Sequence, residues 1–227
     1  MEIVLIRHGQ PEWARDGLRV GNPPLTELGH RQAERLAEAY ADLVPTHVAV
    51  SPLRRTRETA APLLGRLGLS LGEHIEPWLE EIRDPDWHGR PDAEAVAVFE
   101  AADRMPAADR WNGLPGGEPP RDFVGRVAAG ATHWLARHGV RAAPGDLPTW
   151  EIDDLDQRLV IVAHGGTNGV LICHLLGVPP TPWEWQRFSH RHTGVSRFES
   201  FPVGDHFAFT LAELSNVEHL AADQRTG

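Results

Sequence analysis

Lysine is absent from this chain of 227 residues, so all 22 of its basic side chains are arginines. This absence excludes catalysis through a lysine Schiff base and phosphate binding by a lysine-dependent P-loop. Any cationic side chain that binds an anion here must therefore be an arginine or a histidine.

Cysteine is also scarce, because Cys173 stands alone. A single cysteine cannot form a disulfide within the chain. It lies in the apolar stretch 170–173, a setting typical of a small buried residue rather than a reactive thiol. We therefore favour packing over chemistry for Cys173.

Long apolar runs are missing as well, since no stretch approaches the roughly 18 apolar residues that a membrane-spanning helix needs. The chain enters a strand-like segment at once, which leaves no room for a signal peptide, so we expect a cytoplasmic protein. Its formal net charge of −10 disfavours broad attraction to nucleic acid or to an anionic membrane. Neither is expected as a partner, whereas a homodimer is compatible with the sequence.

Hydrophobic residues make up 41% of the chain, which is enough for a packed core. Apolar strand-like segments alternate with helical ones, and no repeat interrupts them. This alternation predicts one α/β domain over residues 1–227, a three-layer sandwich with a mostly parallel central sheet. Residues 83–118 are rich in Pro, Asp, Ala and Trp and predict an insertion that caps the pocket. Trp87 and Trp111 either pack this insertion down or line the pocket, and we favour packing for each.

Two predicted strands end in a histidine followed by a glycine. Residues 3–6 are β-branched and apolar on both alternations, which is typical of a strand buried on both faces, and His8 follows directly after Arg7. Residues 159–163 form a second such run, and His164 follows it. Ligands of parallel sheets bind beyond the carboxyl ends of the strands. Because neighbouring parallel strands lie about 4.8 Å apart, the two histidines could face one small ligand.

An arginine-rich helix is predicted after a further strand at 46–50, with Ser51 as its cap. Arg54, Arg55 and Arg57 crowd its first two turns, where the helix dipole disfavours cations. An anion bound at the helix start would compensate for these charges. The spacing leaves open which arginine points inward, and a solvated face is favoured for Arg54 and Arg57.

A pair of carboxylates, Glu80 and Glu81, follows a predicted strand end within 75–82. One of them could reach the site, and the spacing does not choose between them. Four further helices are expected: one that begins at the Thr26 cap, and others at 93–101, at 123–135 before Gly139 and at 167–176 before Gly177. Residues 140–157 are expected to form a surface excursion. A closing hairpin or edge pair is expected from 194–198 with 206–211.

Four blocks of sequence occur in a fixed order, namely Leu5-Ile6-Arg7-His8-Gly9, Pro24-Leu25-Thr26-Glu27-Leu28-Gly29, Ser51-Pro52-Leu53-Arg54-Arg55-Thr56-Arg57-Glu58-Thr59-Ala60 and Val162-Ala163-His164-Gly165-Gly166. Residues 79–82 and Trp87-His88-Gly89 join them. With these blocks the sequence resembles the histidine phosphatase superfamily, also called phosphoglycerate-mutase-like, over most of its length. Arg-His-Gly alone is a weak motif, but the four blocks in register are highly specific.

The resemblance implies a nucleophilic histidine at His8 and a general acid at Glu81. It also implies phosphate ligands at Arg7, Arg55 and His164, and so selects Arg55 and Glu81 from the alternatives left open above. The implied reaction uses neither a metal nor another cofactor. Phosphoryl transfer needs an in-line nucleophile and stabilised equatorial oxygens, which arginine and histidine N–H groups supply.

The protonation states suit these roles. Nearby arginines disfavour a protonated His8 and keep the lone pair of its attacking nitrogen free. His164 should donate hydrogen bonds instead. A protonated Glu81 could give its proton to the leaving oxygen and then act as base for an incoming water.

The sequence departs from the family pattern near the expected phosphate. Pro11 stands where a Thr or Ser is usual and Ala14 where an Asn is usual, while Pro119 replaces a common serine. Pro85 and His88 also differ from the common pattern around Trp87. We therefore favour a metal-independent phosphomonoesterase, acting through phosphohistidine on a small phosphorylated metabolite, over a cofactor-dependent phosphoglycerate mutase.

Two rival hypotheses come from other classes. A metal hydrolase is one, because His190 and His192 could share a strand face, although no further ligand set accompanies the pair. A catalytically silent family member that binds a phospholigand is the other. A chelator would test the first, and turnover of any phosphomonoester would test the second.

Overall fold

A seven-stranded sheet forms the centre of the computed structural model, which describes all residues 1–227. In spatial order its strands are β4 (His47–Val50), β7 (Arg158–Ala163), β1 (Glu2–Arg7), β8 (Val195–Val203), β9 (His206–Asn216), β6 (Trp150–Ile152) and β5 (Val140–Ala142). The first three run parallel, and all later neighbours pair antiparallel. The expected α/β architecture is confirmed, in a mixed sheet whose parallel part is the half that carries the histidines.

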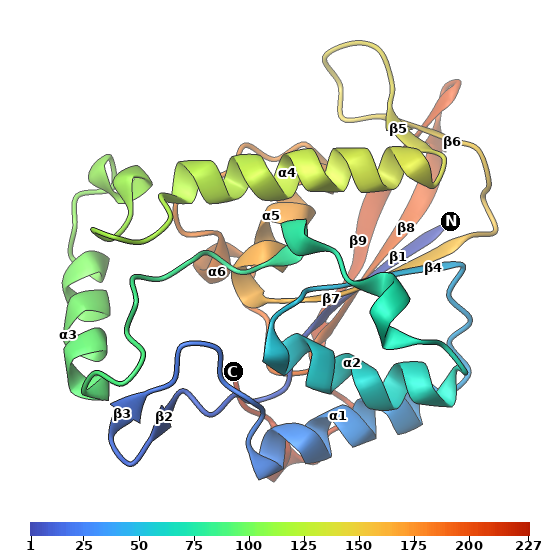
Figure 1. Ribbon diagram of the computed structural model, residues 1–227. Coiled ribbons are helices and arrows are strands. Elements are labelled where there is room, and N and C mark those ends of the chain that lie inside the picture. Colours follow the sequence, from blue (N-terminus) through green and yellow to red (C-terminus); the bar gives the residue numbers. More distant parts are fainter.

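Helices cover both faces of the sheet (Figure 1). The longer ones are α1 (Glu27–Ala39), α2 (Arg54–Arg66), α3 (Asp92–Asp103), α4 (Pro120–Arg137) and α5 (Gly165–Leu176), and α6 (Glu184–Arg187) is a single turn. Ile3 and Leu5 pack in the apolar cluster that includes α4 and α5. Val4 and Ile6 pack in the cluster that includes α1 and α2. Because successive side chains of a strand point to opposite faces, β1 contributes to both cores, and three layers result.

Three helix ends lie where the sequence predicts them. The Thr26 side chain accepts a hydrogen bond from the Gly29 N–H at 3.0 Å and caps α1. The helix α4 ends before Gly139, and α5 ends at Gly177, whose φ of 65° is in the left-handed region.

Other sequence-based expectations need correction. Ser51 does not cap α2, which begins at Arg54 after Leu53. The strand expected within 75–82 is a 3₁₀ turn, η2 (Pro77–Leu79), with only an isolated bridge between Val50 and Ile75. The expected hairpin is formed by β8 and β9, but β8 also pairs with β1, so the hairpin lies inside the sheet. The surface excursion contains the short strands β5 and β6.

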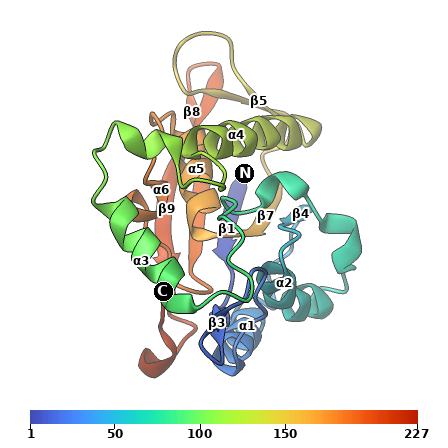
Figure 2. The same cartoon turned by 60° about the vertical axis from the view of Figure 1, so that its left-hand side comes forward.

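The segment 83–118 leaves the body of the molecule and returns to its starting point. It contains α3 and a 3₁₀ turn, η3 (Asp109–Asn112), and both views show α3 apart from the helices that cover the sheet (Figures 1 and 2). The Glu118 N–H donates to the Arg83 carbonyl at 2.7 Å and closes the neck of this loop. A separate two-stranded ribbon, β2 (Ala14–Arg15) with β3 (Leu18–Arg19), lies close to it, since Leu18 bridges to Pro91. None of the helices has the length and hydropathy of a membrane span.

Candidate active site

The two histidines meet at the carboxyl ends of neighbouring parallel strands, as the sequence predicts. In the register of β1 with β7, Arg7 pairs with Ala163, so His8 and His164 follow at equivalent points. Their ring centroids are 5.1 Å apart, and the two residues are only 3% and 0% exposed. Both rings are therefore fixed by strands and surrounded by protein.

Glycines that follow the two histidines permit close approaches that a side chain would block. A Cβ on Gly9 would come within 2.7 Å of the Gly29 carbonyl oxygen at the start of α1. A Cβ on Gly166, two residues after His164, would come within 2.6 Å of the Glu81 carboxylate. The glycines of these motifs thus let α1 and Glu81 pack directly against the strand ends.

The His8 ring is held in its neutral form. Its Nδ1 lies 2.7 Å from the Gly9 carbonyl oxygen, which can only accept, so Nδ1 carries the hydrogen and Nε2 keeps its lone pair. Burial holds the pKa of His8 well below its ordinary value, and the charges of Arg55 and Arg7 lower it further. The imidazole is therefore unprotonated near neutral pH.

His164 is oriented by Ser51, which follows β4 directly. The Ser51 Oγ lies 2.7 Å from His164 Nε2. Burial, together with Arg55 and Arg7, holds the pKa of His164 well below its ordinary value, so the ring is neutral. A hydroxyl that donates to Nε2 leaves the hydrogen on Nδ1, where it is available for donation to a ligand. The sequence assigns Ser51 to a helix cap, and its role as the partner of His164 was missed.

Arg7 and Arg55 direct buried nitrogens into the same region. The Nε atoms of Arg7 and Arg55 and the Nδ1 of His164 are buried and have no hydrogen-bond partner within the protein. Arg7 is anchored by donation from Nη1 to the His190 carbonyl, and Arg55 stacks at 4.9 Å over the Trp13 ring. Burial lowers the pKa of Arg55 to about 10, which leaves it charged at neutral pH. The spacing of Arg54, Arg55 and Arg57 did not choose among them, and only Arg55 is buried.

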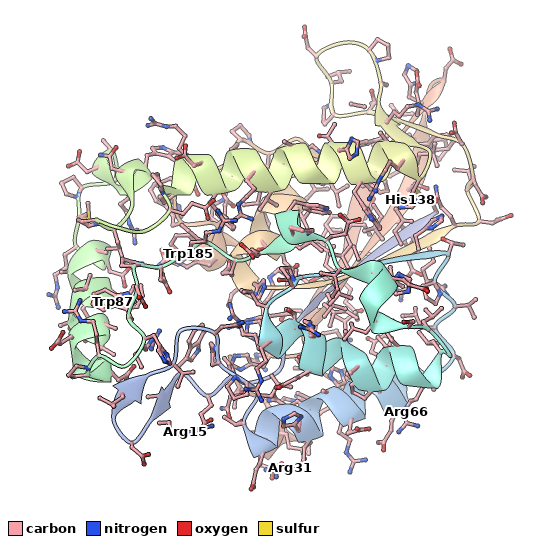
Figure 3. The ribbon with its side chains drawn as sticks, in the orientation of Figure 1. Arg15, Arg31, Arg66, Trp87, His138 and Trp185 are labelled. Carbon is pink, nitrogen blue, oxygen red and sulfur yellow. The ribbon has the colours of Figure 1, made fainter.

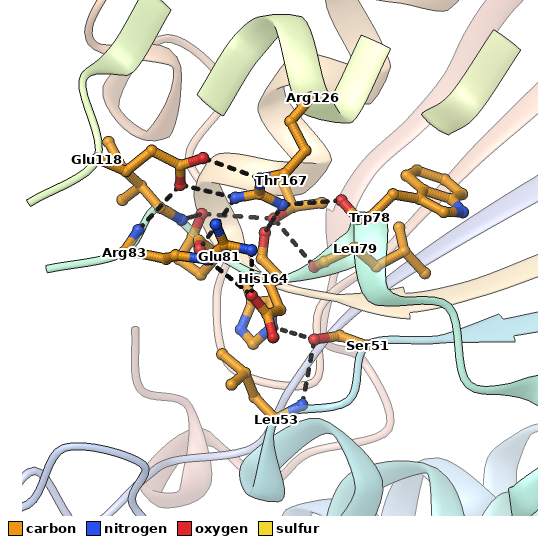
Figure 4. Close-up of polar contacts among 12 residues, drawn as sticks. Ser51, Leu53, Trp78, Leu79, Glu81, Arg83, Glu118, Arg126, His164 and Thr167 are labelled. Carbon is orange, nitrogen blue, oxygen red and sulfur yellow. Dashed lines mark hydrogen bonds and ion pairs between the residues drawn. The ribbon is translucent and has the colours of Figure 1, made fainter. Parts of the chain in front are cut away.

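Glu81 reaches the same strand ends from the irregular segment after η2 (Figure 4). Its Oε2 accepts from the Gly166 N–H at 2.8 Å, at the start of α5, and its Oε1 accepts from the Ile82 N–H at 3.1 Å. Glu80 turns away and pairs with Arg83 at 2.9 Å on the surface. The two neighbouring carboxylates therefore occupy different environments, and Glu81 is the one at the start of α5, beside His164.

A partly buried ion pair holds the backbone that carries Glu81. From α4, Arg126 donates through Nη1 to the carbonyls of Trp78 at 3.0 Å and Glu80 at 3.1 Å. The same guanidinium makes two bonds to Glu118, at 2.9 and 2.8 Å, and Glu118 accepts from the Arg83 N–H at 3.1 Å (Figure 4). Sequence reasoning missed this clamp. Its signal is an arginine three residues after the buried Phe123, on the apolar side of α4.

A hollow of about 770 Å³ adjoins this arrangement, and neither histidine nor Arg7 lines it. Its lining includes Arg55 and Glu81, and it also includes Arg19 and Asp84, which the sequence did not single out. The Asp84 carboxyl is open to the hollow but surrounded by protein, so burial and the charge of Glu81 raise its pKa to about 6. Trp87 lines the hollow and is also 8% exposed, so it packs and lines at once.

His190 and His192 do not form the metal-binding pair considered above. They lie in the loop before β8 rather than on a strand. Both ring nitrogens of His190 lie near protein partners, the Phe188 carbonyl at 2.9 Å and the Ser196 hydroxyl at 3.0 Å. The His192 Nδ1 lies 2.9 Å from the Thr226 hydroxyl. No group of three or more His, Cys, Asp or Glu side chains is arranged to hold a metal ion.

Comparison with known families matches this arrangement. The model of the histidine phosphatase superfamily (branch 1) matches residues 3–208. The chain belongs to the histidine phosphatase superfamily. This membership agrees with the resemblance drawn from the four sequence blocks and with the observed fold.

Histidine phosphatase relatives with different names resemble the chain. The glucosyl-3-phosphoglycerate phosphatase of Mycobacterium tuberculosis (strain ATCC 25618 / H37Rv) is 30% identical over 210 residues, which cover 87% of this chain and 89% of that protein. A probable phosphoglycerate mutase of Cronobacter sakazakii is 28% identical and covers 88% and 85% of the two chains. Among solved structures, that of a mycobacterial glucosyl-3-phosphoglycerate phosphatase has a TM-score of 0.70, with 26% identity and coverage of 95% and 99%.

Proposed function

We propose that this protein is a phosphomonoesterase that transfers the phosphoryl group of a small phosphorylated metabolite to His8 and then to water. The observation that carries the proposal is the set of buried nitrogens on Arg7, Arg55 and His164 without protein partners. They surround a histidine that is neutral and has a free Nε2. Burying such donors without a partner is costly, and the oxygens of a phosphate group would satisfy them.

In the first step, the Nε2 lone pair of His8 attacks phosphorus, and the bond from phosphorus to the ester oxygen breaks. Arg7, Arg55 and His164 stabilise the negative charge on the other phosphate oxygens. Glu81 gives its proton to the departing oxygen, so the alcohol leaves neutral. In the second step, Glu81 takes a proton from water as the water attacks phosphorus, and His8 is released.

The proposal requires no metal ion and no other cofactor, because the two arginines and His164 supply the charge and donors that a metal would provide. The corresponding test is turnover in the presence of a strong chelator. Activity that disappears with chelator and returns with a divalent metal would contradict this part of the mechanism.

A phosphoglycerate mutase is the second candidate, because several relatives are named as probable phosphoglycerate mutases. Water is the favoured acceptor here, since Pro11 and Ala14 replace polar residues common in the family. Free phosphate should therefore accumulate in equal amounts with the dephosphorylated product across a panel of phosphorylated metabolites, with glucosyl-3-phosphoglycerate included. Conversion of 3-phosphoglycerate to 2-phosphoglycerate faster than phosphate release would favour the mutase, and phosphate binding without any turnover would favour a silent phospholigand-binding member.

The proposal also covers the organisation of the chain. We place residues 1–227 in one cytoplasmic domain, with 83–118 as its cap and with neither nucleic acid nor a membrane as a partner. The cap proposal is supported by the closed neck between Arg83 and Glu118 and by the part of the segment that lines the hollow. One domain predicts one cooperative unfolding transition. A homodimer stays compatible with the sequence, and light scattering in solution tests it.

A further inference from the structure

A second hollow, of about 390 Å³, lies against the one that contains Arg55 and Glu81. Residues 82–85 and Trp185 line both hollows, so the two share a wall along the segment that leaves Glu81. Trp185 belongs to α6 and lies nearer the centre of the molecule than Trp87, which lies beside α3 (Figure 3). None of the proposed phosphate ligands lines the second hollow.

The wall of this second hollow is largely apolar. Apart from the shared residues, its apolar members come from α3, from the loops on either side of η3, from the start of α4 and from the segment before α6, and they are Phe99, Ala102, Met105, Leu114, Pro120 and Pro182. Most of them belong to the segment 83–118. The cap therefore supplies a surface that differs in chemistry from the charged strand ends.

The charged residues of this wall are mostly neutralised by protein partners. Arg110 pairs with Asp103 at 2.7 Å, and both line the hollow. Arg83 pairs with Glu80 at 2.9 Å, and Glu118 pairs with Arg126 at 2.8 Å. Only Asp84, on the shared wall, has no such ion pair. A ligand in the second hollow would thus meet few uncommitted charges and a large apolar surface.

We propose that the second hollow is the subsite for the leaving alcohol and that it binds an apolar aliphatic or ring-containing part of that alcohol. This inference rests on the proposed phosphomonoesterase function, because the phosphate group would occupy the adjoining site at Arg55. The substrate class is then an amphiphilic phosphomonoester with an anionic head and an apolar arm. A volume of 390 Å³ falls within the range of small-molecule sites, roughly 300–1,000 Å³.

Straight-chain alkyl phosphates test the subsite. Along ethyl, butyl and hexyl phosphate, kcat/KM should rise about fourfold for each added methylene group, the usual effect of burying one such group. Ala102→Trp places a large side chain in the second hollow and should remove this gain. The matched control is Ala101→Trp, on the exposed side of the same helix, which should keep the full chain-length dependence.

Binding of alkylphosphonates, measured by calorimetry, separates the subsite from catalysis. Affinity should also increase with chain length in the unmodified protein, and Ala102→Trp or Leu114→Asp should flatten the increase. Flat affinities and flat kcat/KM together with turnover of ethyl phosphate would overturn the subsite and leave the phosphatase proposal intact. A chain-length increase in affinity that the two variants abolish, in a protein without any turnover, would support the subsite and contradict the phosphatase proposal. An increase that both variants retain would place the apolar arm elsewhere and overturn the inference.

Discussion

The strand ends and the segment 78–118 contribute to one site in contrasting ways. At the strand ends, His8, His164 and Arg55 are 3%, 0% and 4% exposed and are held by β1, by β7 and by the first turn of α2. In the irregular segment, Arg83 is exposed and the backbone is held by a few side-chain contacts. Residues proposed to hold the phosphate group thus lie on or directly after regular, buried elements, whereas those proposed to contact the leaving group lie in an insertion made of loops and α3.

Substitutions at the strand ends should cause the largest losses of activity. His8→Ala removes the proposed nucleophile and should lower kcat/KM by at least about 10³-fold for every substrate, whatever its leaving group. Far-ultraviolet circular dichroism should show an unchanged fold. A variant that retains turnover near the original level would show that the strand-end histidine is not the nucleophile.

Changes in the irregular segment should depend on the leaving group. Glu81→Gln removes the proposed proton donor and should slow phosphorylation of His8 by an alkyl phosphate by about 10²–10⁴-fold. With p-nitrophenyl phosphate, whose leaving group departs as a stabilised anion, the rate should stay much nearer to that of the unmodified protein. The measurement is the single-turnover burst, because Glu81 also acts in the later attack by water.

Glu80→Gln is the matched control for Glu81→Gln, since Glu80 pairs with Arg83 at the surface. Its effect on the burst should be small. Equal losses for both substrates in Glu81→Gln, or a larger loss in Glu80→Gln, would exclude the acid role of Glu81.

The clamp between Arg126 and Glu118 should have an intermediate effect of the same kind. Glu118→Gln weakens the pair that holds the Glu81 backbone, and a small displacement of a catalytic group costs up to about 10²-fold in rate. We expect the loss in the alkyl phosphate burst to exceed the loss with p-nitrophenyl phosphate. Arg121→Met, at an exposed arginine of α4, is the control and should change neither. A uniform loss with both substrates would indicate a structural role alone.

The smallest predicted effect concerns pH and Asp84. Its pKa is about 6 in the folded protein, above the value near 3.9 of an unfolded chain, so the folded state disfavours the carboxylate. Stability is then lost as pH rises from about 4 through 6, and Asp84→Asn should remove that loss. The carboxylate also repels a phosphate group, so Asp84→Asn should tighten binding of inorganic phosphate about fivefold at pH 7. At pH 5, where the carboxyl is protonated, the substitution should hardly change this binding. Comparing both proteins at each pH cancels the ionisation of phosphate, and a ratio that does not change with pH would contradict this account.

Much of the strand-end site could be predicted from the sequence, and the irregular part could not. Buried strands have a strong apolar signature, and His8 and His164 follow two of them, so their meeting is a consequence of parallel pairing. The choice of Arg55 and Glu81 over their neighbours needed the family resemblance, because spacing along a helix or loop did not decide it.

The site residues that the sequence did not predict depend on contacts that form only in the folded chain. Ser51 is of a residue type common at helix caps, and only the tertiary structure brings it to His164. Arg126 and Glu118 contact the backbone of residues 78–83, although up to 48 positions of sequence separate the partners. No local sequence pattern encodes such a contact. Asp84 owes its raised pKa to burial in a hollow that forms only when the chain is folded.

Trapping the covalent intermediate tests the central claim most directly. A phosphomonoester carrying labelled phosphate should be mixed with the protein and quenched in alkali within one turnover, because a phosphorus–nitrogen bond survives base and is lost in acid. Label should appear in the peptide that contains His8 and should be released by acid. The His8→Ala variant should carry no label. Label on any other residue, or normal turnover with no label at His8, would contradict the central claim.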